Sequence, residues 1–362
     1  MRILFWITTV RRKSCMNRSI QYLLNYDFKD IFSKIIKNMT NKEIETTVDI
    51  DYMPFNQRVP DFQYQELLKK IKTTGKDKMP IHARLAENSS SGHQNSKEIT
   101  GAMLQFDMSN GFPVLTERDL NKSFYGAIGE LVAFLNGQST LCGLKDYGCP
   151  EVFWKNWVTK EKCANFGLSE GDLGDGSYGA SLKYFQSAKG NFDQVSAVQR
   201  QMEKAPFLRT HVLTTWNPPL SMGDEEQGFK REVVVAPCHG NFVHFVLFDK
   251  QKELEMTHTQ RSADVPVGLQ LNLIEWSALG LMVAHLLGYK FTKYTHFISN
   301  PHYYDVQAES VDKILSIKPN AFPTVSLKPN REVTRIQDFR KEDFVLEDYK
   351  PSEPWFKIPT PI

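Results

Sequence analysis

The 362-residue sequence is poor in cysteine and has no long apolar run, and each absence excludes a class of protein. Its five cysteines are an odd number without a Cys-x-x-Cys pair, which is too sparse for a disulfide framework or a four-ligand zinc site. No stretch approaches the roughly 20 apolar residues that span a bilayer. The apolar residues 1–10 are followed by their basic cluster and lack a cleavage pattern. We therefore expect a reducing, cytoplasmic setting (host cytoplasm for a viral chain), no membrane partner and no metal.

The sequence also lacks a strong excess of either charge. Its 44 Lys and Arg against 42 Asp and Glu leave a formal net charge of +2, so a stable nucleic-acid partner is disfavoured. The 41% of apolar and 12% of aromatic residues are enough for a sizeable core. A folded globular protein is expected.

The chain divides into an N-terminal extension at residues 1–60 and a large domain at residues 61–362. The extension has little amphipathic regularity, and the sequence leaves its order open. No internal repeat is present. Prolines punctuate residues 319–362, which predicts an extended arm that is mobile until something docks it.

Hydrophobic periodicity, β-branched runs and turn residues predict the elements of the domain. Helices are expected at 62–72, 123–136, 193–204 (with Asp193 as N-cap) and 271–287 (closed by Gly288). Strands are expected at 210–216, 233–248 and 254–259, the last two as a hairpin, and a further hairpin within 99–115 that turns at 110–111. One acid, Glu130, lies among the apolar residues of the 123–136 helix. Burying a carboxylate is costly, so this placement suggests a specific role for Glu130.

Cys238 is the first candidate for chemistry. It lies in an apolar strand-like run, and Arg261 and Ser262 follow the next expected strand. A guanidinium nearby stabilises a thiolate, which is the nucleophilic form of cysteine. A lone strand cysteine is nevertheless more often an inert core residue, so both interpretations stay open on local sequence alone.

The segment 260–272 brings Arg261, Ser262, Asp264 and Asn272 to the start of a buried helix. A guanidinium beside a hydroxyl suits a phosphate, and an Asn side chain pairs a donor with an acceptor. Ordinary capping and a surface ion pair are the alternative explanation for this segment in isolation.

Ordered matches along residues 62–362 resolve these alternatives. The sequence resembles the thymidylate synthase and pyrimidine-nucleotide hydroxymethylase family at Pro237–His239, Gln260–Asp264, Gly268 and Asn272. Further matches are at 110–113, Glu130, Phe134, Trp154, Trp157, 171–174, Tyr178, Arg209, 216–217, 295–296 and 342–351.

The resemblance implies an α+β fold in which a large mixed sheet is backed by helices. It also implies a homodimer built sheet to sheet, in which Arg209 reaches into the neighbour's site. The implied reaction transfers one carbon from 5,10-methylenetetrahydrofolate, as co-substrate, to C5 of dUMP through a thiolate adduct of Cys238 at C6.

The same resemblance implies the roles of the site residues. The catalytic set is Cys238, Glu130, Tyr178, His239 and Arg261; the nucleotide-binding set is Arg209, Arg261, Ser262, Asn272, His296 and Gln260; the folate-binding set is Asp264, Trp154 and Gly268. Asn272 would pair with the O4 and N3 edge of uracil. Glu130, in an apolar helix, would relay protons with a raised pKa.

Departures from the family pattern affect the predicted product. Gln270 and Leu271 stand where Pro-Phe is usual, Ile298 stands where a Tyr is usual, and Thr210 replaces the second Arg of a pair. Arg84 is the nearest candidate for an N-terminal phosphate-binding Arg. Changed polarity near the nucleotide favours water attack and 5-hydroxymethyl-dUMP, the deoxyuridylate hydroxymethylase branch, with selectivity for deoxyribose left open.

Two alternatives remain beside this prediction. Trp154 and the C-terminal arm favour thymidylate synthase, in which hydride from the folate gives dTMP and dihydrofolate. A catalytically silent member that binds a nucleotide or RNA is a lower alternative, which the retained Cys238, Glu130, Arg261 and Asn272 oppose.

Overall fold

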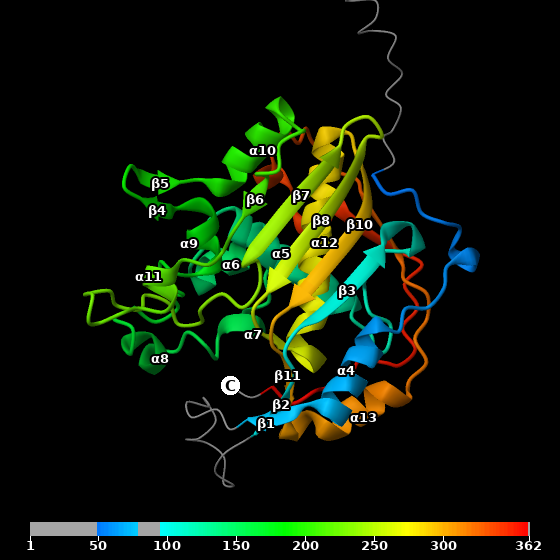
Figure 1. Cartoon of the computed structure of the whole chain (residues 1–362), viewed down its shortest axis with the longest axis horizontal. Helices are drawn as coiled ribbons and strands as arrows, with labels where there is room; N and C mark the ends of the chain where they lie inside the picture. The colour runs from blue at the N-terminus through cyan, green and yellow to red at the C-terminus, as the bar shows by residue number, and fades with distance from the viewer. Residues whose placement is uncertain (1–48, 79–94, 361–362) are drawn as a thin grey trace, which may run out of the picture. The chain divides into compact units, whose positions relative to one another are not determined.

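A computed structural model describes residues 49–78 and 95–360 (Figure 1). Residues 1–48 and 79–94, the latter including Arg84, lie outside the described part of the chain. The main helices are α4 (Gln63–Thr74), α5 (Asn121–Leu135), α6 (Leu141–Asp146), α7 (Glu151–Trp154), α8 (Lys160–Ala164), α9 (Tyr178–Lys183), α10 (Gln194–Lys204), α11 (Pro218–Ser221), α12 (Gln270–Leu287) and α13 (Ala308–Ser316).

Strands from distant parts of the chain form the central sheet, whose order is β3-β10-β8-β7-β6. Strands β10 and β8 are parallel and the other neighbours are antiparallel, so the sheet is mixed as expected. The strands are β3 (Ala102–Asp107), β6 (Val212–Leu213), β7 (Phe242–Phe248), β8 (Glu253–Gln260) and β10 (Lys290–Ile298). A second sheet, β1-β2-β11-β9, joins β1 (Lys76–Lys78), β2 (Ser96–Glu98), β11 (Pro301–Tyr304) and β9 (Ala263–Asp264).

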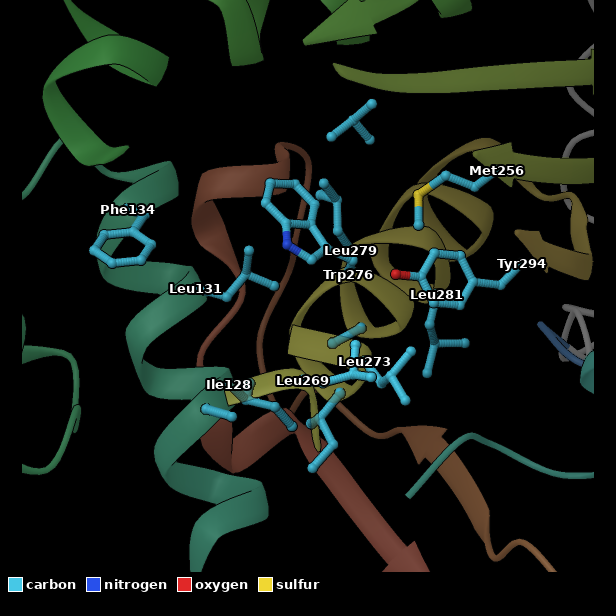
Figure 2. Packing of buried hydrophobic residues seen from close by; sticks show 14 of the residues in the cluster. Ile128, Leu131, Phe134, Met256, Leu269, Leu273, Trp276, Leu279, Leu281 and Tyr294 are labelled. Atoms are coloured by element: carbon cyan, nitrogen blue, oxygen red, sulfur yellow. The ribbon is translucent and has the colours of Figure 1, made fainter. Parts of the chain in front are cut away.

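Helix α12 is the centre of the core. It packs against β8 and β10 on one side and against α5 on the other (Figure 1). Figure 2 shows Ile128 and Leu131 of α5 on one side of α12, Leu131 near Trp276, with Met256 and Tyr294 of the sheet across the helix. Residues 265–287 are long and apolar enough to cross a membrane, but 83% of their most apolar stretch is buried within the fold. The run is therefore a core helix, apolar all round because both sides are covered.

Several predicted elements are confirmed. Helices α4, α5, α10 and α12 occupy the expected segments, and the Asp193 side chain accepts from the N–H of Ser196 as the N-cap of α10. Gly288 ends α12 in the left-handed conformation, with φ +67°. Strands β7 and β8 form the expected antiparallel hairpin.

Other predicted elements are wrong. The hairpin expected within 99–115 does not form, because β3 pairs with β10 instead. The strand expected at 233–248 begins only at Phe242, since the carbonyl groups of 236 and 237 accept from Arg261. The strand expected at 210–216 shortens to β6. The C-terminal arm carries its own antiparallel pair, β12 (Thr324–Leu327) and β13 (Phe344–Glu347).

Residues 49–60, expected in the extension, pack on the domain. Asp49 accepts from the imidazole of His285 at 2.8 Å, Ile50 is buried, and Arg58 donates to the carbonyl of Phe322 at 3.0 Å. Of the described residues, those from 49 to 360 belong to one compact unit. The packed chain therefore starts about a dozen residues before the boundary predicted at 61.

Gly240, directly before β7, is held at φ +69° with its N–H on His258 at 2.7 Å. A Cβ atom there would lie 2.5 Å from the Trp276 ring. We expect Gly240→Ala to lower the free energy of unfolding by about 3 kcal/mol, from backbone strain and overpacking together. Gly288→Ala, at φ +67° in open space, is the matched control and should cost only about 1–2 kcal/mol in thermal or denaturant unfolding. Equal losses would contradict the role of the Trp276 contact.

Candidate active site

Cys238 lies at the end of the loop before β7, half-buried and free of any disulfide. Its backbone N–H donates to the hydroxyl of Tyr178 at 2.7 Å, which ties the loop to the start of α9. A nitrogen of the Arg261 guanidinium, Nη2, lies 3.4 Å from Sγ. The sequence-predicted nucleophile therefore has a guanidinium in contact with its sulfur.

Arg261 is held in place by backbone groups. Its Nε donates to the carbonyl of Pro237 at 2.8 Å, its Nη2 donates to that of Ala236 at 2.8 Å, and its Cζ lies 5.3 Å from the ring centre of Trp216. Its own N–H also donates to the Asn241 side chain at 2.8 Å. The guanidinium is thus fixed before any anion arrives, and a fixed charge loses little entropy on binding.

Glu130 reaches the site from α5 and is buried. Trp154 donates its indole N–H to Oε1, and the carboxyl group also hydrogen bonds with Glu275 of α12. Burial raises the pKa of Glu130, and the bonds from Glu275 and Trp154 oppose that rise. The position of this acid in an apolar helix is explained by these two partners.

The rings of His239 and Tyr178 lie in contact beside Cys238, with centres 4.4 Å apart and planes tilted by 31°. The indole N–H of Trp276 donates to Nδ1 of His239 at 3.0 Å, so a neutral His239 carries its proton on Nε2. Burial lowers the pKa of His239 to about 3. Burial likewise raises the pKa of Tyr178 well above its ordinary value. Both groups are neutral at physiological pH.

Asn272, Gln260 and His296 come together in one hydrogen-bonded row. Gln260 Nε2 donates to Oδ1 of Asn272 at 2.9 Å, and its Oε1 lies 2.9 Å from Nε2 of His296. The row joins the first turn of α12 to the ends of β8 and β10. These three of the residues that the sequence assigned to the nucleotide are therefore neighbours.

Asp264 lies beyond this row, at the second sheet. Gln307 donates to its carboxylate at 3.0 Å and also donates to the carbonyl of Pro359 at 2.9 Å. Arg118 donates to the carbonyl of Phe356 at 2.9 Å. Burial raises the pKa of Asp264 to about 7, against the lowering effect of Gln307. The C-terminal arm is thus docked beside the predicted folate-binding acid.

Three sequence-predicted residues contribute no side-chain contact to this cluster. Arg209 follows α10 and is exposed. Ser262 contributes only its backbone carbonyl, which accepts from Gln260 at 2.9 Å. Gly268 lies in the turn before α12, and a Cβ atom placed on it would lie 3.8 Å from Oδ1 of Asn272. Among the described residues, no group of three or more His, Cys, Asp or Glu side chains has the arrangement of a metal site.

Sequence reasoning missed Glu275 and Trp276. Glu275 is buried on α12, its Oε2 accepts from Asn272 at 3.0 Å, and its hydrogen bond with Glu130 joins the two helices. It is the one acid in an otherwise apolar helix, which is the same signal that singled out Glu130. That signal could have found it.

Comparison with known families agrees with this geometry. Residues 62–360 match the family model described as Thymidylate synthase. The match covers most of the chain, including every element that places a side chain in the cluster.

Proposed function

Because the chain belongs to the thymidylate synthase family, whose reaction is a folate-dependent one-carbon transfer to dUMP, we propose that Cys238 is the nucleophile of that reaction. Its thiolate adds to C6 of the pyrimidine, and C5 then attacks the methylene carbon of 5,10-methylenetetrahydrofolate. The Arg261 contact with Sγ is the observation that supports this role. The assembled contacts also favour an enzyme over a silent nucleotide- or RNA-binding protein.

We assign the other roles as the family resemblance implies them. Arg261, Ser262 and a partner's copy of Arg209 bind the phosphate; Asn272 reads the base, with Gln260 and His296 behind it. Glu130, Tyr178 and His239 relay protons to O4 and from C5 through water. Asp264 and Trp154 bind the folate, with Gly268 in the turn between them and α12. The buried, uncharged surroundings of Glu130 suit a group that must both accept and return a proton.

The geometry favours a methyl product, which makes thymidylate formation the proposed activity. Glu130, Tyr178, Trp154 and His239 are each less than 9% exposed, and the arm is docked on Arg118 and Gln307. A closed, dry site protects the exocyclic methylene from water until hydride arrives from the folate.

Gln270 and Ile298, the departures that predicted a hydroxymethyl product, do not change the polarity of the site in the way that the sequence suggested. Both hydrogens of the Gln270 amide are used, on Tyr64 and Pro266, and its oxygen accepts from Arg118 at 3.1 Å. Ile298 is 1% exposed. Gln270 therefore has no spare hydrogen for a water molecule, Ile298 has no polar group, and both side chains are buried.

Formation of 5-hydroxymethyl-dUMP is the second candidate, and Glu275 favours it. A second buried carboxyl group next to Glu130 adds a polar atom that could hold a water molecule near the exocyclic methylene. Deoxyribose selectivity remains part of the same question, since Ile298 has no hydroxyl for the sugar.

Product analysis separates the two candidates. Purified full-length protein is given dUMP and 5,10-methylenetetrahydrofolate, and the nucleotide product is analysed by mass spectrometry. We expect dTMP, with a rise in absorbance as dihydrofolate forms. A product heavier by one oxygen atom, without that rise, would establish the hydroxymethyl branch.

We also propose a homodimer and a cytoplasmic location. The face of the sheet away from α12 exposes the large apolar side chains of Met103, Phe242, Phe248 and Phe297. A second copy packed on this face would cover them and would bring in Arg209. A monomeric mass by light scattering would contradict the dimer. The free thiol at Cys238 supports a reducing compartment.

A further inference from the structure

Glu275 is a buried carboxyl group that the reaction steps above do not use. It is 1% exposed and comes from the second turn of α12. Its Oε2 accepts from Nδ2 of Asn272 at 3.0 Å, and no donor in the described part of the chain reaches its Oε1. Its carboxyl group also hydrogen bonds with that of Glu130. A buried polar group with this placement links the base-reading residue to the proton-handling residue.

The hydrogen bonds around Asn272 can run in only one direction, because backbone groups fix which side-chain atoms donate and which accept. The carbonyl of Ser262 can only accept, so the Gln260 atom 2.9 Å from it is the amide nitrogen. The same nitrogen faces Asn272 at 2.9 Å. The atom of Asn272 at that contact is therefore its oxygen, and its nitrogen faces Glu275.

A second backbone group, at the far end of the row, requires the same direction. The N–H of Gly240 can only donate, so Nε2 of His258 accepts and a neutral His258 carries its proton on Nδ1. That proton is donated to Tyr294 at 3.1 Å, whose hydroxyl donates to Nδ1 of His296 at 3.2 Å. His296 then donates from Nε2 to Oε1 of Gln260. The two ends agree on the orientation of the Gln260 amide.

This direction leaves Asn272 with one spare acceptor site on Oδ1 and one spare hydrogen on Nδ2. Uracil presents an N–H at position 3 and an acceptor at O4, which is the complementary pattern. Cytosine presents an acceptor at position 3 and an amino group at position 4. Its acceptor would face Oδ1 of Asn272, and its amino group would face Nδ2, so neither pair could hydrogen bond. The orientation of one amide therefore decides which base fits.

The hydrogen bond between Glu275 and Glu130 requires at least one proton on the pair. Each carboxyl group accepts one N–H, Glu130 from Trp154 and Glu275 from Asn272, and the second oxygen of Glu275, Oε1, receives no donor from the described residues and is free to carry the proton. The pKa of Glu275 is raised well above its ordinary value by burial and then by Glu130. The other titratable groups that face it are Cys149, Tyr178, His239 and Tyr294, all buried and neutral.

We propose that Glu275 is a positioning residue: as a neutral carboxyl group, it accepts from Asn272, donates to Glu130, and so holds Asn272 in the orientation that selects uracil over cytosine. This inference rests on the base-reading role proposed for Asn272 and on dUMP as substrate, not on which product forms.

The test measures equilibrium binding of dUMP and of dCMP, without folate, to the full-length protein and two variants. Glutamine has a carbonyl group and an amino group in place of the carbonyl and hydroxyl of a neutral glutamic acid. Methionine has similar length and neither group. We expect Glu275→Met to weaken dUMP binding by about 10- to 100-fold and to narrow the preference over dCMP, because Asn272 loses its anchor. Glu275→Gln should recover the dUMP affinity to within about threefold and restore the preference.

A pH series keeps the proposal testable if Glu275→Met does not fold. The ratio of dUMP affinities of wild type and Glu275→Gln should stay constant from about pH 6 to pH 9, because a neutral group and its neutral mimic behave alike. A ratio that changes with pH, a Gln variant as impaired as the Met variant, or a Met variant with the full dUMP preference would each overturn the proposal. Equal wild-type affinity for both nucleotides would instead refute the role of Asn272, and this proposal with it.

Discussion

Replacing Cys238 with alanine is expected to lower kcat by at least about 10⁴-fold while dUMP still binds. In the proposed mechanism the thiolate forms the covalent bond to C6 that activates C5, and no neighbouring group can replace it in that step. Arg261 keeps four of its contacts without the thiol, since its partners at 236, 237, 216 and 241 are unchanged. The phosphate-binding charge therefore stays in place. Steady-state turnover and equilibrium binding of dUMP measure the two effects separately.

Cys142 offers the matched control for this prediction. It is a free and exposed cysteine on α6, remote from the contacts of Cys238. Cys142→Ala should keep the wild-type kcat. Turnover retained by Cys238→Ala would exclude the adduct mechanism, and loss of dUMP binding together with turnover would show that the thiol acts mainly in the structure of the loop.

The elements that the sequence predicted well are those determined by local patterns. Helix α10 begins at an N-cap that is visible in the sequence as Asp193, and α12 ends at Gly288, whose positive φ most other residue types adopt only with strain. The strand expected at 233–248 does not form before Phe242, because Arg261, which is distant in sequence, takes carbonyl groups that a sheet would have used. Tertiary hydrogen bonds of this kind leave no periodic signal.

The site shows the same division. A single acid in an apolar helix marks both Glu130 and Glu275, so their burial can be read from the sequence. Their contact depends on how α5 packs on α12, and the roles of His258 and Tyr294 depend on the parallel pairing of β8 with β10. The motifs identify the participants in the reaction, whereas the direction of their hydrogen bonds follows only from the assembled fold.

Glu130→Gln is expected to lower kcat by about 10²- to 10⁴-fold with little change in dUMP affinity. The amide keeps the volume of the carboxyl group and can still accept from Trp154, so the packing of α5 on α12 is preserved. It cannot accept a proton from C5, which is the step assigned to Glu130, and loss of a general base has an effect of this size. A loss of affinity equal to the loss of kcat would contradict a role in proton transfer.

The pH profile tests the same role by its sign. Burial raises the pKa of Glu130, so wild-type kcat should fall as the pH is lowered through that raised value and the proton acceptor is lost. Trp154→Phe removes a bond that opposes the rise, and should move this acid limb to higher pH. Asp264, whose pKa burial raises to about 7, also titrates in this range. The pH profiles are therefore measured with Asp264→Asn present, both with and without Trp154→Phe. His239, whose pKa burial lowers to about 3, titrates below the pH range of this limb. Glu130→Gln has no titrating carboxyl group at this position, so the pH dependence of its residual kcat should no longer show the part of the acid limb that comes from Glu130. An acid limb unchanged from wild type would assign the titration to another group.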